Sequence, residues 1–425
     1  MVSEQKLLQG HGIYRQSKIH CRHCWLPKGP MQPEPQIPAG LPAPDPISLR
    51  HSELVADYIR AQIDAAGGTI SMAEFMQHAL YAPGLGYYTA GSTKFGESGD
   101  FVTAPEISPI FGRVLAGQCA PVIAALQGGV LELGAGSGSL AVTMLRKLKD
   151  LDALPSSYQI LEISPDLTER QQAKIAAEIP ELLSIVRWID AMPVNFNGVV
   201  VANEVADALP VERFVRTSED ILQLCVGWRD ERFIYQTRTA SGPLRDSVIE
   251  IENRTGARLA EGYTSEVSLG LQGWLENILV AIDQGVVFIF DYGVARHEYY
   301  SPERNQGWLR CHFRHHAHNE PLIYPGIQDV TSWVDFSALA EGAARHGADI
   351  VGFVTQALFL MNGGLENELA DFESLSSAEQ VELSRQIKLL TLPSEMGENF
   401  KCIGVSKGTV PSLAAFDFGD RAHTL

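Results

Sequence analysis

The sequence is poor in positive charge, and this shortage excludes one class of partner. Its 425 residues hold 33 Lys and Arg against 51 Asp and Glu, a formal net charge of −18. An acidic surface repels phosphate backbones, and we find no basic stripe with interleaved aromatic residues. We therefore expect no nucleic acid as a partner, and we expect a basic segment of another protein to be favoured over an acidic one.

Cysteine is scarce as well. The six cysteines lie at positions 21, 24, 119, 225, 311 and 402, without the dense framework of a small secreted domain, so a reducing compartment fits best. Cys21 and Cys24 form a C-x-x-C with flanking histidines, but a second ligand pair at finger spacing is missing. The histidine-rich residues 311–318 also lack metal-ligand spacing, and loop hydrogen bonding is the better interpretation. We expect no metal site.

Long apolar runs are missing too. Even the most apolar stretches, such as residues 286–290, are far too short to cross a bilayer, so we expect no membrane span. The chain has no apolar signal-peptide core at its start, although residues 5–28 are basic and free of acids, which suits a mitochondrial presequence only loosely. We expect a cytoplasmic location in a bacterium, or the mitochondrial matrix if the chain is eukaryotic.

The most informative stretch is residues 131–138, Leu-Glu-Leu-Gly-Ala-Gly-Ser-Gly, where an apolar strand runs into a glycine loop and then into a periodic helix over 139–149. Glycine tolerates positive φ, so the loop can turn tightly and let a ligand approach its backbone. The helix that follows offers free N–H groups. A dinucleotide fingerprint would place its third small residue at Ser139, but the third glycine comes one residue early. The resulting pattern, E-x-G-x-G-x-G, resembles the first motif of class I S-adenosylmethionine (SAM) methyltransferases.

Polar residues follow the next predicted strands at the same relative position. The strand predicted over residues 158–163 carries Glu162 near its end, where it could accept hydrogen bonds from a ribose diol. The strand over residues 184–189 is followed by Asp190, placed to accept a hydrogen bond from an adenine amino group. The strand predicted over residues 198–202 is followed by Asn203 and Glu204. Parallel strands meet at one sheet edge, where open α/β sheets bind ligands. We therefore predict a SAM site made of Glu132, Gly134, Gly136, Gly138, Glu162, Asp190 and Asn203.

Before the glycine loop, two helices are predicted over 52–66 and 71–80, followed by the glycine-rich residues 81–99. So many glycines predict a mobile loop. We interpret it either as a lid that closes over cofactor and substrate or, with equal weight, as an ordinary flexible surface loop. The segment that follows supplies the expected lid and substrate residues, which are Asp100, Thr103, Pro105 and Glu106.

The predicted fold class is α/β, a class I methyltransferase sheet of Rossmann type with additions at both ends. Residues 1–46 are a proline-rich extension that we expect to be poorly ordered, and 47–126 hold the N-terminal helices and lid. Residues 127–407 form the SAM-binding domain, with an inserted β subdomain over about 211–260. C-terminal helical additions and a tail over 408–425 complete the chain. Residues 299–335 show no clear period.

Several blocks together resemble one family. They are Gly86-Tyr87-Tyr88, residues 99–108, residues 132–136, Asn203-Glu204, residues 207–210, Asp291-Tyr292-Gly293, Gln328-Asp329-Val330 and Met396-Gly397-Glu398. From about residue 52 to 407 the chain is similar to the MidA family, whose mitochondrial members are known as complex I assembly factor 7, a protein-arginine methyltransferase. The resemblance implies a class I methyltransferase fold, SAM as methyl donor and symmetric omega-N dimethylation of an arginine on a respiratory complex I subunit. Residues 1–46 and the histidine-rich segment depart from the pattern.

A mechanism follows from the chemistry of arginine, because guanidinium stays protonated and a carboxylate can grip it and draw its charge. If the turn after residue 203 is helical, Glu204 and Asp207 project on one face. Our hypothesis is that both hold the guanidinium and accept its proton, with Asn203 and residues 100–106 shaping the pocket. Alternatively, Asp207 caps a helix and only Glu204 meets the ligand. Two other functions stay open: an assembly factor that binds SAM without catalysis, and a methyltransferase that acts on a small molecule. Oligomeric state is left open.

Overall fold

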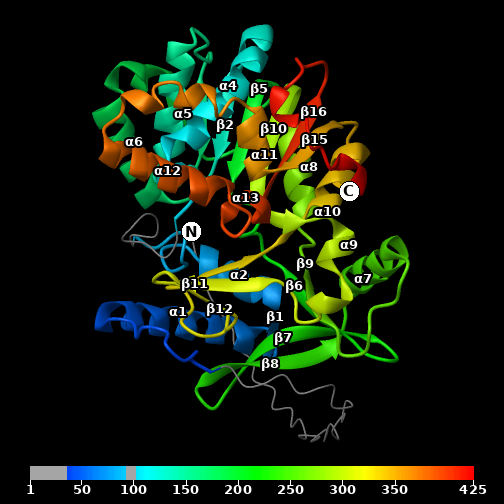
Figure 1. Ribbon diagram of the computed structural model, residues 1–425. Helices are drawn as coiled ribbons and strands as arrows, with labels where there is room; N and C mark the ends of the chain where they lie inside the picture. Colours follow the sequence, from blue (N-terminus) through cyan, green and yellow to red (C-terminus); the bar gives the residue numbers. More distant parts are fainter. Residues whose placement is uncertain (1–35, 92–101) are drawn as a thin grey trace, which may run out of the picture. The chain divides into compact units, whose positions relative to one another are not determined.

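A computed structural model describes residues 36–91 and 102–425. Its central sheet has the strand order β15-β16-β10-β5-β2-β3-β4, with β14 pairing on β10 (Figure 1). The strands from β10 to β4 run parallel, whereas β16 is antiparallel to both its neighbours. The bounds are β2 Gly129–Leu133, β3 Tyr158–Leu161, β4 Val186–Ile189, β5 Phe196–Asn203, β10 Ile282–Val294, β14 Val334–Asp335, β15 Asp349–Thr355 and β16 Phe400–Lys407. The predicted Rossmann-like α/β fold is confirmed.

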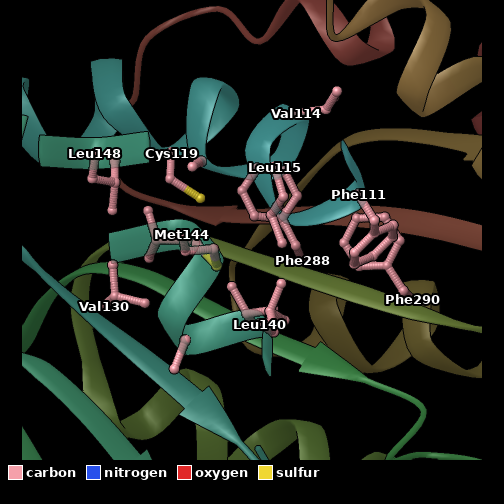
Figure 2. Packing of buried hydrophobic residues seen from close by; sticks show 14 of the residues in the cluster. Phe111, Val114, Leu115, Cys119, Val130, Leu140, Met144, Leu148, Phe288 and Phe290 are labelled. Atoms are coloured by element: carbon pink, nitrogen blue, oxygen red, sulfur yellow. The ribbon is translucent and has the colours of Figure 1, made fainter. Parts of the chain in front are cut away.

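Helices cover both faces of this sheet because its buried strands alternate their side chains between two cores. Val199 and Val201 of β5 face one core, whereas Val200 and Ala202 face the other. Figure 2 shows the first core, where Phe111 of α4 meets Phe290 of β10 edge to face with ring centroids 5.0 Å apart. The helices are α4 Pro109–Leu126, α5 Ser139–Asp150, α6 Pro165–Glu178, α8 Leu271–Ala281, α9 Arg296–Tyr299, α10 Phe336–Arg345, α11 Gln356–Asn362, α12 Ser377–Thr391 and α13 Met396–Asn399.

One of these helices corrects the view that long apolar stretches are missing. Within the described residues, α4 is the one helix that is long and apolar enough, by length and composition, to cross a membrane. Its mean hydropathy is 1.4, yet 56% of the stretch is buried inside the fold. It packs against α5 and the central sheet as a core helix.

A second sheet lies below the central sheet in Figure 1, beside α1 and α2. Its order is β1-β7-β6-β9, and β8 pairs with β7. The bounds are β1 Thr69–Ser71, β6 Glu212–Arg216, β7 Ile221–Arg229, β8 Arg232–Thr239 and β9 Thr264–Val267. Two features differ from the β-rich insertion expected over 211–260. The helix α7, Gly242–Thr255, interrupts the run of strands. The strand β1 joins the sheet from the N-terminal region, and the sequence did not predict it because a strand of three residues shows no alternating pattern.

Residues 299–335, for which no period was found, hold a third sheet of order β12-β11-β13. Its strands are β11 Leu309–Phe313, β12 His316–His318 and β13 Asp329–Ser332, too short for an alternating pattern to show. The histidine-rich segment is the hairpin of β11 and β12, turned by Arg314 and His315 at positive φ of 48° and 61°. No group of three or more potential metal ligands is arranged around a metal position in residues 36–91 and 102–425.

The N-terminal helices are α1, Pro46–Ala65, and α2, Met72–Tyr81, and Asp45 caps the first. The glycine-rich segment expected as a mobile lid follows α2, and the structure describes it as far as residue 91. Residues 82–91 form turns, and Tyr87 and Tyr88 donate backbone hydrogen bonds to Ala79 and Leu80. A Cβ on Gly86 would lie 2.5 Å from the backbone of Leu80, so this glycine permits close packing. Residues 92–101, including Asp100, lie outside the described residues, as do residues 1–35.

The C-terminal tail returns to the sheet. Phe416 stacks on Phe288 of β10 with ring centroids 6.3 Å apart. Room for its ring depends on Gly352 and Gly404, where an added Cβ would lie 2.5 and 2.8 Å from it. Leu413, Ala415 and Phe416 therefore pack into the first core, whereas Ala422 and Leu425 at the end of the chain pack against the second core.

Candidate functional site

A cavity of about 1000 Å³ opens where β2, β3 and β5 end. The strands β3 and β4 lie on one side of β2, and β5 and β10 lie on its other side. The strand order therefore reverses at β2, and the cavity lies at this topological switch point of the sheet. Its wall includes Gln77, Tyr81, Tyr88, Thr89, Thr103, Pro105, Glu106, Glu132, Gly134, Gly136, Ser137, Glu162, Ile163, Met192, Asn203, Glu204, Leu209, Pro210, Trp274 and Asn277.

The glycine loop adopts the conformation that its composition requires. Gly134, Gly136 and Gly138 have φ of 62°, 53° and 81°, a region that side chains with a Cβ disfavour. Gly138 is the N-cap of α5, so the loop leads directly into the first turn of that helix. Ser139 and Leu140 of this first turn line the cavity, so the positive end of the helix dipole lies beside Gly134 and Gly136.

Two predicted acids lie at this end of the cavity, which we call the cofactor end. Glu132 is 3% exposed, and the Tyr158 hydroxyl donates to its Oε2 at 2.6 Å. Burial raises the pKa of Glu132 to about 7, and the Tyr158 hydrogen bond opposes the rise. Glu162 accepts hydrogen bonds from the Ser164 N–H at 2.9 Å and from the Gln171 amide at 3.0 Å.

Gln171, which sequence reasoning missed, connects the parts of the cofactor end. Its Nε2 donates to the Gly136 carbonyl at 2.9 Å as well as to Glu162, and its Oε1 accepts from the Trp188 indole at 2.9 Å. A signal was present, since Leu167, Gln171 and Ile175 form one buried stripe of α6. A polar residue on an apolar helix face needs a hydrogen-bonding partner in the core.

Two predicted cofactor residues, Gly138 and Asp190, do not line the cavity, and Asp190 departs further from the prediction. Its side chain is exposed and does not line the cavity, whereas Met192, two residues later, does. An apolar side chain thus lines the wall near the end of β4, where we expected a carboxylate for the adenine amino group.

Glu204 lies on the cavity wall in an unusual backbone conformation. Its φ is 54°, and its N–H donates to the Phe290 carbonyl at 2.9 Å. The Asn203 amide donates to its Oε1 at 3.2 Å. Burial raises the pKa of Glu204 well above its usual range, and the neighbouring carboxylates Asp207 and Asp329 raise it further.

The turn after Glu204 is not helical, and this corrects the expectation that Glu204 and Asp207 project on one face. Asp207 is 3% exposed and does not line the cavity. Its carboxyl group accepts a hydrogen bond from Tyr292, while its Oδ1 has no partner among the described residues. Burial raises the pKa of Asp207 to about 6. Of the two carboxylates, only Glu204 can touch a ligand in the cavity.

Two tyrosines that sequence reasoning did not assign to the site form the wall near Glu204, at the substrate end of the cavity. Tyr81 and Tyr88 stack with ring centroids 5.5 Å apart. The Tyr81 hydroxyl donates to the Ala208 carbonyl at 2.9 Å, and the Tyr88 hydroxyl donates to Asp329 Oδ1 at 2.8 Å. A signal was present for Tyr88, which belongs to the Gly86-Tyr87-Tyr88 block of the family resemblance, but not for Tyr81.

Three of the expected lid residues also line the cavity. Thr103, Pro105 and Glu106 line the cavity around the short helix α3, Ala104–Ile107. The Ser137 hydroxyl of the glycine loop donates to Glu106 Oε1, so this segment docks on the loop itself. Asp100 lies outside the described residues.

Comparisons with known proteins agree with this geometry. A family model described as an S-adenosyl-L-methionine-dependent methyltransferase matches residues 114–354. The protein arginine methyltransferase NDUFAF7, mitochondrial, of Danio rerio is 30% identical over 80% of this chain and 84% of its own. The Drosophila melanogaster homologue is 28% identical over 84% and 85%. A crystal structure of a Burkholderia thailandensis protein bound to S-adenosyl-homocysteine has a TM-score of 0.85 and 38% identity, and the match covers 91% of this chain and all of that one, 100%.

Proposed function

The chain belongs to a family of SAM-dependent methyltransferases, and on this premise we propose that it methylates arginine side chains of a partner protein. The enzyme class and the cofactor come with the family. The arginine substrate is our proposal. It is supported by the names of the vertebrate and insect relatives and by the charge at the substrate end of the cavity.

The residues at the cofactor end fit SAM. The glycine loop and the start of α5 would hold its amino acid part, and Glu162 would accept hydrogen bonds from its ribose. Asn203 Oδ1 is buried and has no partner among the described residues, as expected of an acceptor that a ligand completes. Bound SAM supplies a sulfonium methyl group that is open to in-line displacement.

The observation that carries the arginine proposal is the charge around Glu204. The charged groups that shift its pKa, Asp207 and Asp329, are both acids. Asp291, which is fully buried nearby, has its pKa raised by burial and then by Asp207 and Glu204. Such a cluster is costly in the free protein, and a cation in the cavity would relieve it. A guanidinium matches that charge, and its planar fork matches a carboxylate.

The chain's own groups then account for the reaction. Glu204 grips the guanidinium, draws its positive charge toward the contacted nitrogens and accepts a proton as the target nitrogen is methylated. Asp207 acts through its charge on Glu204. Tyr81 and Tyr88 close the wall and exclude water, which strengthens these interactions.

We extend the proposal to a finer statement on the family resemblance. The target is an arginine on a subunit of respiratory complex I or a similar protein, the product is symmetric omega-N dimethylarginine, and the site of action in a eukaryotic cell is the mitochondrial matrix. The relatives named above are mitochondrial proteins.

The test is to incubate the purified protein with methyl-labelled SAM and a lysate from cells that lack it, and to locate the label by mass spectrometry. Label on arginine of one protein is the expected result. Label on a small molecule would replace the substrate class, and tight SAM binding without any transfer would favour an assembly factor that uses SAM as a structural ligand.

A further inference from the structure

The turn that presents Glu204 to the cavity depends on a carboxylate behind it. Asp291, at 0% exposure on β10, accepts hydrogen bonds at one oxygen, Oδ2, from the Ala206 N–H at 3.0 Å and the Asp207 N–H at 3.1 Å. Its other oxygen, Oδ1, accepts from the Tyr292 N–H at 2.9 Å. Asp291 does not line the cavity, so it can reach a ligand only through this turn.

We propose that Asp291 is a positioning residue that fixes the turn of residues 204–208 and thereby aims Glu204 at the substrate. The inference rests on the proposed function, in which Glu204 accepts the substrate's proton. A glutamate at φ of 54° is strained and persists only where the surrounding structure enforces it. Asp291 accepts two of the hydrogen bonds that hold this conformation, from the N–H groups two and three residues after Glu204.

The other bonds to the turn come from different elements. The Phe290 carbonyl accepts from Glu204 N–H, the Ser332 N–H of β13 donates to the Asp207 carbonyl at 2.9 Å, and Tyr81 of α2 donates to the Ala208 carbonyl. Asp291 differs from these groups because its carboxylate accepts three hydrogen bonds, all of them from backbone N–H groups. An aspartate is required there, because an asparagine has one acceptor oxygen and would turn its NH₂ group against an N–H.

The variant that tests this is Asp291→Asn, with Asp420→Asn as the matched control. Asp420 also accepts two backbone N–H bonds at one oxygen, from Phe353 at 2.8 Å and Ala422 at 2.9 Å, but lies outside the cavity. In Asp291→Asn we expect amide hydrogen exchange over residues 204–208 to accelerate about tenfold or more while the glycine loop is unchanged. We expect kcat to fall about 10- to 100-fold with the KM for SAM and the Kd for S-adenosyl-homocysteine unchanged. Asp420→Asn should show neither effect.

Unchanged exchange in the turn of Asp291→Asn would overturn the inference whatever the activity. If that variant does not fold, exchange in the unaltered protein decides, since Ala206 and Asp207 amides that exchange as fast as a free turn would also overturn it. The methylation rates of Glu204→Gln, Asp291→Asn and the double variant show whether Asp291 acts through Glu204 or independently of it. Equal loss in the double variant and Glu204→Gln supports action through Glu204, and multiplied losses contradict it. Full methylation activity in Glu204→Gln would instead refute the catalytic role of Glu204, on which this inference rests.

Discussion

The carboxylates at the two ends of the cavity have different neighbours. At the cofactor end, Glu132 and Glu162 each accept hydrogen bonds from nearby donors, Tyr158 and Gln171. At the substrate end, Glu204 lies among other acids, and their charges raise its pKa beyond the effect of burial. The difference teaches that neutral donors hold the carboxylates of the cofactor end, where Asn203 Oδ1 is an acceptor without a partner among the described residues, whereas the substrate end holds negative charge that a cationic ligand would balance.

The two ends also differ in how far apart their partners lie in the chain. Gln171 reaches Gly136 over 35 residues, and Tyr158 reaches Glu132 over 26. At the substrate end Tyr88 bonds Asp329 over 241 residues, and Ala206 bonds Asp291 over 85. The cofactor end is thus built from the consecutive elements β2 to β5, and the substrate end needs the N-terminal helices, the end of β10 and the small third sheet together.

The largest expected effect comes from removing the charge at the substrate end. Glu204→Gln should lower the rate of methyl transfer about 100-fold or more, because general-base catalysis of this kind contributes about 10² to 10⁴. Cofactor affinity should stay the same, since the change leaves the glycine loop and Glu162 untouched. The rate of the unaltered enzyme should rise with pH through the raised pKa of Glu204, as the carboxyl group loses its proton.

The matched control is Glu276→Gln, an exposed carboxyl of α8 that pairs with His346 and does not line the cavity. It should keep full activity and the same pH profile. A Glu204→Gln enzyme with the profile and rate of this control would remove Glu204 from the reaction.

The next largest effect is expected at the cofactor end. Glu162→Ala should raise the Kd for SAM about 10- to 100-fold, the loss expected when hydrogen bonds that a ribose donates to a charged carboxylate are removed. At saturating SAM the transfer rate should recover, in contrast to Glu204→Gln. Isothermal titration calorimetry with S-adenosyl-homocysteine measures the affinity, and an unchanged Kd would exclude Glu162 from the ribose site.

A smaller effect is expected for the residue that ties the cofactor end together. Gln171→Met keeps the volume but leaves Glu162, the Gly136 carbonyl and the Trp188 indole each short of one partner. The Kd for S-adenosyl-homocysteine should rise about three- to tenfold while kcat at saturation is retained. If kcat fell with the affinity unchanged, Gln171 would belong with the substrate end and the division drawn above would be wrong.

The smallest effect on activity is expected at Glu132, where the consequence is for stability. Its pKa is raised from 4.5 to about 7, so the folded state holds the proton more tightly than the unfolded state. Its contribution is therefore greatest below pH 4.5 and is lost as the pH rises toward 7, by up to about 1.4 kcal/mol per pH unit. Glu132→Gln should remove that slope. Urea unfolding of both proteins at several pH values tests this, and a free-energy difference between them that does not vary with pH would contradict it.

Local chemistry made the cofactor end readable. The glycine spacing required positive φ, and Ser164 followed by Pro165 announced the start of α6, where the Ser164 hydroxyl accepts from the Leu167 N–H. Because parallel strands end at one edge, Glu162 and Asn203 could be placed at the cavity from their positions alone. Asp190 could not, since a residue just past a short strand can face solvent or the cavity.

Composition, spacing and the family resemblance therefore determined the fold class, the central strands, the glycine loop and the identity of the cofactor. Tertiary structure alone decided that Glu204 sits at positive φ, that Asp207 turns inward, and that Tyr88, Asp329 and Asp291 surround them. The physical reason is range. A backbone conformation or helix cap depends on a few neighbouring residues, whereas the charge and shape of the substrate end arise from side chains that only packing brings together.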